Sequence, residues 1–379
     1  MKQLIYADNA ATTKLDKKAF ETMLPWLQAE YGNASQPYSF SRAPKHAIAE
    51  ARSIIASCIN ASPEEIYFTS GGTESDNWAI KGASIINQRR KLTITSQIEH
   101  HAVLNSCKSI ERLGYPVVYL PPDSKGIISP EAVEPIIDSK VHLLSIMFAN
   151  NEIGTIEPIK QLAKIASEKG VLFHTDAVQA VGHVKIDVND LGVDMLSASA
   201  HKFNGPKGVG FLYVRRGTEI APLLDGGGQE KGFRAGTENT AGIVGMATAL
   251  QTNCQLMQEI QNRLSTLETI ILNSINQLDY IRNGHSCHIP GNISLSFSNI
   301  DGESLLHLLD LKGISISTGS ACDSVNNQVS HVIRALGVHE KYAKGTIRIS
   351  LGRENTEEDA KAIGKALVQV VGTIQNRQE

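Results

Sequence analysis

Between about residues 60 and 215, short apolar runs rich in β-branched side chains alternate with longer segments of helical periodicity. This alternation is typical of βαβ units, in which helices cover the faces of a mainly parallel sheet. The predicted strands are Ile66–Thr69, Leu92–Thr95, Val117–Leu120, Leu143–Ala149, Val171–Thr175, Met195–Ala198 and Val209–Val214. Helices are predicted over Ser75–Arg90 and Ile159–Lys169. The pattern therefore predicts an α/β fold whose large domain holds a mainly parallel, seven-stranded sheet.

A second, smaller α/β unit is predicted after the glycine-rich stretch Gly226–Gly236 and a long helix over residues 241–278. Its predicted strands are Asn292–Phe297, Ile314–Ser317 and Thr346–Leu351, and its predicted helices are Glu303–Leu311, Val329–Leu336 and Glu357–Val371. A chain of 379 residues is also long enough for two domains. We predict a large domain over residues 15–255 and a small domain made of residues 1–14 and 256–379, with the boundary inside the long helix.

Charge and apolar patterning restrict the classes of partner. The 36 Lys and Arg residues nearly balance 39 Asp and Glu residues, so there is no global attraction to nucleic acid or anionic membranes. No segment reaches the roughly 18 apolar residues of a membrane span, and the N-terminus lacks a signal-peptide pattern. The five cysteines are scattered, without a CxxC pair. We therefore expect a cytoplasmic protein with reduced thiols, no metal site, and no direct nucleic-acid or membrane partner.

Two polar residues at predicted strand ends suggest a carbonyl-bearing cofactor. Lys202 follows the strand that ends at Ala198 and precedes a flexible Gly205–Gly208 loop, although most lysines are surface charges. Asp176 comes at the carboxyl end of another strand, where open α/β sheets place their ligands. A carboxylate there can pair with a protonated pyridine nitrogen, although an aspartate after a strand is also a common helix N-cap. Gln179 can donate to a ring phenolate.

The run from Thr69 to Glu74 leads a strand into a helix through Gly71 and Gly72. Two glycines allow close backbone approach, and the free amides of a helix start attract a phosphate, although an ordinary strand-to-helix connection has the same pattern. Ser199 and His201 can add contacts beside Lys202. A phosphate-binding turn, a strand-end Asp and a strand-end Lys, in that order, are what a pyridoxal-phosphate site requires.

With these motifs the sequence resembles the NifS/IscS cysteine desulfurases, in the class V group of fold-type I aminotransferases. The resemblance extends over about residues 6–365 and is carried by DNAATT from Asp8, TSGGTESDN from Thr69, NNEIG from Asn150, HTDAVQ from His174, and SASAHKFNGPKGVG from Ser197. It implies the fold of a fold-type I pyridoxal-phosphate-dependent transferase.

The resemblance assigns roles residue by residue. Lys202 matches the lysine that binds the cofactor covalently, Asp176 the partner of the pyridine nitrogen, and Gln179 the partner of the phenolate. His100 matches the histidine that stacks on the ring and moves protons, and Asn151 a contact to cofactor and substrate. The matched phosphate ligands are Gly72, Thr73, Ser199 and His201.

The segment Arg234–Thr240 resembles one that reaches the phosphate of a neighbouring subunit, with Thr237 as the ligand. This implies a homodimer with shared sites, whereas a plain glycine-rich surface loop is the ordinary alternative.

Cys322 lies in a small, polar run after the predicted strand that ends at Ser317. A generic cysteine is most often a buried, inert thiol, but the Gly, Ser, Asp and Asn residues around Cys322 offer nothing to bury it against. The resemblance makes it the cysteine of a Gly-Ser-Ala-Cys loop that becomes a persulfide, and the loop length matches the IscS-like group. Arg348, on a predicted strand, matches the arginine that binds the substrate carboxylate, with a solvent-facing arginine as the alternative.

The resemblance implies a cysteine desulfurase that converts L-cysteine to L-alanine and passes persulfide sulfur from Cys322 to an acceptor protein. The destinations are iron–sulfur cluster assembly, tRNA thiolation or DNA phosphorothioation. A selenocysteine lyase or an aminotransferase of the same class is the alternative enzyme. The alternative to an enzyme is a cofactor-bearing scaffold that holds a sulfur-acceptor protein. Departures from the family pattern at Tyr38, Ser41 and Val329 bear on the choice of acceptor.

Overall fold

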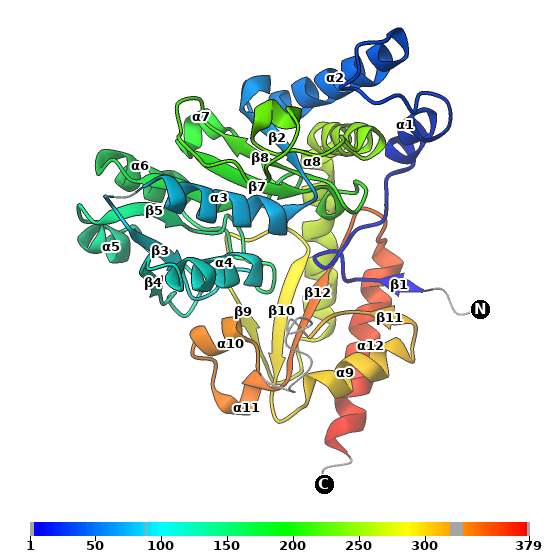
Figure 1. The fold of residues 1–379 in the computed structure, drawn as a ribbon. Helices are drawn as coiled ribbons and strands as arrows, with labels where there is room; N and C mark the ends of the chain where they lie inside the picture. Colours follow the sequence, from blue (N-terminus) through cyan, green and yellow to red (C-terminus); the bar gives the residue numbers. More distant parts are fainter. Residues whose placement is uncertain (1–3, 88, 319–328, 377–379) are drawn as a thin grey trace.

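The computed structural model describes residues 4–87, 89–318 and 329–376, and its main sheet has seven strands in the order β2-β8-β7-β6-β5-β3-β4 (Figure 1). The strands are β2 (Ile66–Thr69), β3 (Leu92–Ser96), β4 (Val117–Leu120), β5 (Val141–Ser145), β6 (Leu172–Asp176), β7 (Met195–Ser199) and β8 (Gly210–Val214). Only β8 runs antiparallel to its neighbours β2 and β7. The prediction of a mainly parallel, seven-stranded sheet is confirmed.

The predicted end of the fifth strand was wrong. β5 ends at Ser145 instead of Ala149, because the amide of Met147 donates to the Glu99 carboxylate at 2.9 Å instead of continuing the ladder toward β3. On the β6 side the main chain continues to pair, since the amide of Phe148 donates to the Asp176 carbonyl at 2.8 Å. A buried side chain thus ends a strand that its apolar sequence would extend.

Helices cover both faces of this sheet (Figure 1). Helices α3 (Gly72–Ile86) and α4 (His101–Glu111) pack on one face through a cluster that includes Trp78, Val103 and Leu143. Helices α2 (Arg42–Cys58), α6 (Ile159–Glu168) and the first half of α8 (Thr240–Ser274) pack on the other face. The remaining helices of this part are α1 (Lys17–Gln28), α5 (Pro130–Val133) and α7 (Val188–Leu191).

The rest of the chain forms a second layered unit below the main sheet (Figure 1). Strands β9 (Tyr280–Asn283), β10 (Asn292–Phe297) and β12 (Thr346–Ser350) form an antiparallel sheet, and β1 (Ile5–Tyr6) pairs in parallel with β11 (Ile314–Ser315). Its helices are α9 (Gly302–Asp310), α10 (His331–Ala335), α11 (Glu340–Ala343) and α12 (Glu357–Gln375). The sequence analysis missed β9, and the strand predicted to end at Ser317 ends at Ser315.

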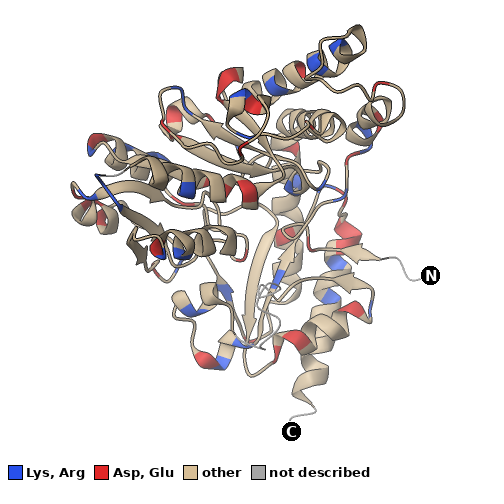
Figure 2. Cartoon of the chain, viewed as in Figure 1, with Lys and Arg blue, Asp and Glu red and all other residues tan. Residues whose placement is uncertain are grey.

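Helix α8 takes part in two hydrophobic clusters. Its first half supplies Ile243, Met246 and Leu250 to the cluster under the main sheet, and its second half supplies Leu264 and Ile271 to that of the small sheet. This distribution supports the boundary proposed inside the long helix, with residues 15–255 and residues 1–14 plus 256–379 as two domains. Charges of both signs are spread over the outer helices (Figure 2). Among the helices that the structure describes, none has the length and apolarity needed to span a membrane.

A buried ion pair fastens the glycine-rich loop at residues 226–236 to the main sheet. The Arg52 guanidinium donates to both carboxylate oxygens of Glu230 at 2.6 and 2.8 Å, and the Phe68 amide donates to the same carboxylate at 2.9 Å. The two side chains are only 16% and 4% exposed.

We expect Arg52→Leu to lower the free energy of unfolding by about 3 kcal/mol, because it leaves a buried carboxylate without its cation. Urea denaturation measures the change. Lys17→Leu, at an ion pair whose side chains are 90% and 58% exposed, is the control and should cost less than about 1 kcal/mol. Equal effects of the two substitutions contradict the prediction.

Candidate active site

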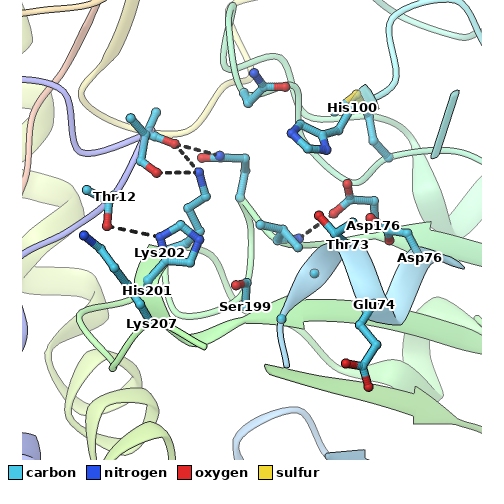
Figure 3. A pocket seen from close by; sticks show the side chains of 18 of the residues that line it. Thr12, Thr73, Glu74, Asp76, His100, Asp176, Ser199, His201, Lys202 and Lys207 are labelled. Carbon is cyan, nitrogen blue, oxygen red and sulfur yellow. Dashed lines mark hydrogen bonds between the residues drawn. The ribbon is translucent and has the colours of Figure 1, made fainter. Parts of the chain in front are cut away.

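A cavity of about 560 Å³ opens at the carboxyl ends of the central strands, where the main sheet faces the small one (Figure 3). It brings together most of the residues that the sequence singled out, namely Gly72, Thr73, His100, Asn151, Asp176, Gln179, Ser199, His201, Lys202 and Arg348. Thr237 is exposed on the loop before α8 and does not line the cavity. Cys322 lies outside the described residues.

Lys202 is held in this cavity by main-chain oxygens. It stands on a short turn after β7, and its Nζ donates to the carbonyls of Ala10 and Ala11 at 2.6 and 2.9 Å. Gln179 Nε2 donates to the same Ala10 carbonyl at 3.0 Å. The neighbouring His201 ring reaches the Thr12 hydroxyl at 3.1 Å. The N-terminal segment therefore orients Lys202, Gln179 and His201.

Asp176 ends β6 with its carboxylate in the cavity, 5% exposed. Its Oδ1 accepts a hydrogen bond from the Val178 amide at 2.9 Å. Burial raises the pKa of this carboxyl to about 6, although the Val178 amide and the Lys202 charge act to lower it. A cationic group bound in the cavity would therefore keep Asp176 ionised at neutral pH.

His100 caps the start of α4, and its Nδ1 accepts a hydrogen bond from the Ala102 amide at 3.1 Å. With Nδ1 as the acceptor, a neutral ring carries its proton on Nε2. Burial, together with the nearby charges of Lys202 and His101, lowers the pKa of His100 to about 4. At neutral pH His100 is thus an uncharged donor.

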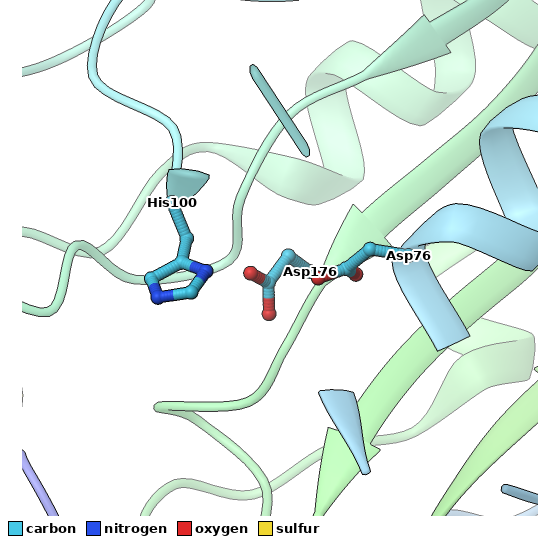
Figure 4. Close-up of side chains that lie close together, drawn as sticks. All are labelled: Asp76, His100 and Asp176. Atoms are coloured by element: carbon cyan, nitrogen blue, oxygen red, sulfur yellow. The ribbon is translucent and has the colours of Figure 1, made fainter. Parts of the chain in front are cut away.

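The sequence analysis missed Asp76 as a cavity residue. Asp76 lies on α3, and its carboxylate, the His100 ring and the Asp176 carboxylate have ligand-type atoms within 4.8 Å of one another (Figure 4). Its position four residues after Gly72 was a usable signal, because residues i and i+4 share one face of a helix.

The start of α3 forms a cradle without side chains. Gly71 has a φ of +148°, and a Cβ on Gly72 would lie 2.5 Å from Val178 Cγ2. The first amides of a helix have no partners within the helix, and they attract an anion. The Glu74 side chain extends away from His100 and Lys202 (Figure 3) and accepts from Arg234 at 2.8 and 3.2 Å. The only acidic residue of this first turn is thus neutralised by a partner outside the cradle.

Arg348 on β12 enters the cavity from the small sheet and is 4% exposed, so the alternative of a solvent-facing arginine was wrong. Its Nη2 donates to Asp8 Oδ1 at 2.6 Å, and its Nη1 donates to the Asn151 carbonyl at 3.0 Å. Nε has no hydrogen-bond partner among the described residues. The guanidinium is thereby held in place in the cavity wall by Asp8 and the Asn151 carbonyl.

Comparison with known proteins decides the family. Residues 5–363 match the family described as aminotransferase class-V. The cysteine desulfurase IscS of Dictyoglomus turgidum is 48% identical over 95% of this chain and 92% of its own. The chain belongs to the class V aminotransferase family, in its cysteine desulfurase group.

Solved structures that are similar to this chain have the same fold. A NifS-like protein superimposes with a TM-score of 0.93 at 37% identity, over 98% of this chain and 100% of its own. The structure of SspA in complex with cysteine gives a TM-score of 0.82 at 38% identity, over 92% and 98% of the two chains. The predicted fold-type I architecture is confirmed.

The cavity of this class V chain fits pyridoxal 5′-phosphate, the cofactor that the sequence resemblance implies. Lys202 supplies an amine, Asp176 supplies a buried carboxylate for a ring nitrogen, and the α3 start with Ser199 supplies donors for a phosphate. The glycine cradle, which a single Cβ at Gly72 would fill, is the observation that tests the fit most directly.

Gly72→Ala should lower the free energy of unfolding of the cofactor-free chain by about 1–3 kcal/mol, because the new methyl group overlaps Val178. Adding Val178→Ala should recover most of the loss, as urea denaturation will measure. Gly372→Ala on α12 is the control, since its Cβ meets nothing within 4 Å. A Gly72→Ala variant as stable as this control would show that the cradle is not tight.

Proposed function

We propose that the chain is a pyridoxal-phosphate-dependent cysteine desulfurase that converts L-cysteine to L-alanine and leaves the sulfur on Cys322 as a persulfide. The observation that carries the proposal is the convergence of Lys202, Asp176 and the α3 glycine turn in one cavity. The relatives support the choice within the family, since the IscS protein at 48% identity is named a cysteine desulfurase. An aminotransferase or a selenocysteine lyase is not favoured.

Bound pyridoxal phosphate would supply an electron sink for charge that develops at the substrate Cα. Lys202 would hold it covalently, Asp176 and Gln179 would bind its ring, and the α3 start with Thr73, Ser199 and His201 would bind its phosphate. Lys202 Nζ, which donates to the Ala10 and Ala11 carbonyls in the cavity, would be placed to move the Cα proton of a bound substrate.

The other residues bind substrate and handle its sulfur. Arg348, with Asn151 beside it, would bind the substrate carboxylate in competition with Asp8. His100 would be uncharged before the reaction and would donate the proton on its Nε2 to the reacting substrate. The Cys322 thiolate would attack the substrate sulfur, so that a sulfur–sulfur bond forms as the carbon–sulfur bond breaks. The electron pair of the broken bond would stay with the substrate carbon, which takes up a proton before alanine leaves.

Cys322→Ser tests the chemistry. It should retain the visible absorption of the bound cofactor but lower alanine production from cysteine by at least about 100-fold, because the covalent acceptor is gone. Cys287→Ser, at an exposed free cysteine, is the control and should leave turnover unchanged. Lys202→Ala should lose both turnover and the absorption of the covalently bound cofactor.

Other outcomes separate the alternatives. Unchanged turnover in Cys322→Ser would favour another class V activity, since those reactions need no loop thiol. Wild-type chain that stays colourless with added pyridoxal phosphate would favour a scaffold.

A homodimer with shared sites belongs to the same proposal. Thr237 is exposed on a loop that two ion pairs fasten, Arg52–Glu230 and Arg234–Glu74, so it projects from a fixed base. Large apolar side chains are exposed in and after α1, namely Phe20, Leu27, Tyr31 and Phe40 at 48%, 60%, 73% and 43%. Such side chains favour a surface that another chain covers.

Mixed dimers test the role of Thr237. Thr237→Ala alone should weaken cofactor affinity about tenfold, the loss of one hydrogen bond to a charged group. Dimers of one Thr237→Ala and one Lys202→Ala chain should contain one site of wild-type affinity, because that site takes both intact residues. If every site in the mixed dimer is defective, Thr237 acts within its own subunit.

Transfer of the sulfur to an acceptor protein in the cytoplasm completes the proposal, with iron–sulfur cluster assembly as one destination beside tRNA thiolation and DNA phosphorothioation. The name of the IscS relative and the free state of all four described cysteines support it. Ser41, a departure from the family pattern, is buried, and its hydroxyl lies 2.6 Å from the carbonyl oxygens of both Gln36 and Tyr38 and donates its one proton between them. A persulfide-transfer assay against a panel of acceptors identifies the destination.

A further inference from the structure

Two buried carboxyl groups meet at the floor of the cavity. Asp176 comes from β6 and Asp76 from α3, and the two side chains lie next to each other (Figure 4). Asp176 and Asp76 are 5% and 1% exposed. Oδ1 of Asp76 has no hydrogen-bond partner among the described residues, although it is fully enclosed. The site proposed above uses Asp176 and leaves Asp76 without a function.

The groups around Asp76 supply no balancing positive charge. His174 Nε2 lies 3.7 Å from Asp76 Oδ1, but it also lies 3.0 Å from the Ser197 hydroxyl, and its Nδ1 lies 2.8 Å from the Ser145 hydroxyl. Burial lowers the pKa of His174 to about 3, so this ring is neutral. The ion pairs of the described residues give Asp76 no lysine or arginine.

The other titratable groups near Asp76 do not change this balance. Asp176 and Glu99, the second from the connection between β3 and α4, are acids and supply no positive charge. Burial raises the pKa of Glu99 to about 8, so it is mostly neutral at pH 7. His100 is uncharged, and the charge of Lys202 acts on Asp176. Two buried carboxylates this close together cannot both be ionised at moderate cost.

We propose that Asp76 is a positioning residue that carries the proton of this carboxyl pair, so that Asp176 is the ionised member that holds the cofactor ring nitrogen. This inference rests on the proposed function for the role of Asp176. A protonated Asp76 is a hydrogen-bond donor, and a donor beside Asp176 stabilises its negative charge in a buried place.

The electrostatics of the two groups agree with this division. Burial raises the pKa of Asp76 well above its ordinary value, and the Asp176 charge raises it further, against a lowering by the Ser197 hydroxyl. The pKa of Asp176 rises only to about 6, because the Val178 amide and Lys202 oppose its burial. Asp76 is therefore the member of the pair that keeps the proton.

The first experiment uses the full chain without cofactor and compares wild type with Asp76→Asn. Above the unfolded pKa of about 3.9, wild-type Asp76 must take up a proton on folding, and the cost grows with pH until the folded pKa is reached. Asparagine carries no such cost. The free energy of unfolding of Asp76→Asn relative to wild type should therefore rise between pH 5 and pH 8, by about 1.4 kcal/mol per pH unit at most.

The control is Asp310→Asn, an exposed aspartate at the end of α9, which should show no such slope. A difference for Asp76→Asn that is flat or falls with rising pH overturns the inference, because it means that Asp76 folds in its ionised form. This experiment needs no cofactor, so its outcome is independent of whether the chain is a desulfurase.

The second experiment measures pyridoxal-phosphate affinity and the pH dependence of the visible absorption of the bound cofactor. Asp76→Asn should bind like wild type, since an amide at this position can supply the donor that we propose for Asp76. Asp76→Val should bind about tenfold more weakly, the loss of one donor to a charged group. Equal losses in both variants, or none in Asp76→Val, contradict a donor role. Failure of wild type to bind pyridoxal phosphate would overturn the proposed function instead.

Discussion

The geometry of the cavity depends on the N-terminal segment that joins the two sheets. Asp8 holds Arg348 of the small sheet, and the carbonyls of Ala10 and Ala11 hold Lys202 of the large one. The Thr13 amide then donates to the His201 carbonyl at 2.9 Å, and Arg353 pairs with Asp16. Because these contacts follow one another along a few residues, the segment sets the distance between Arg348 and Lys202.

The site combines two cations with buried acids of unequal character. Lys202 and Arg348 face main-chain oxygens and Asp8, whereas Asp76, Asp176 and Glu99 lie where burial opposes ionisation. A positive charge bound at the strand ends would favour ionisation only of the acid that it contacts. On the division proposed for Asp76 and Asp176, neighbouring carboxyl groups of this fold take different protonation states.

Much of this architecture is readable from the sequence because it is encoded locally. Apolar β-branched runs marked all seven strands of the main sheet, and strand-end polar residues marked Lys202 and Asp176. The features that the sequence did not predict depend on tertiary contacts. The end of β5 is set by Glu99, and the partners of Lys202 are main-chain atoms nearly 200 residues away. The spacing of Asp76 from Gly72 places it on the cavity side of α3, but its closeness to Asp176 depends on how α3 packs on the sheet.

The main-chain hydrogen bonds between the N-terminal segment and Lys202 affect how this segment can be studied by mutagenesis. Every residue type supplies a main-chain oxygen, so exchanging the side chains of Ala10 or Ala11 leaves the acceptors in place. A point-mutation library read at these positions would report only the space available for larger side chains. The contribution of the segment would emerge from insertions or deletions, which move the oxygens themselves.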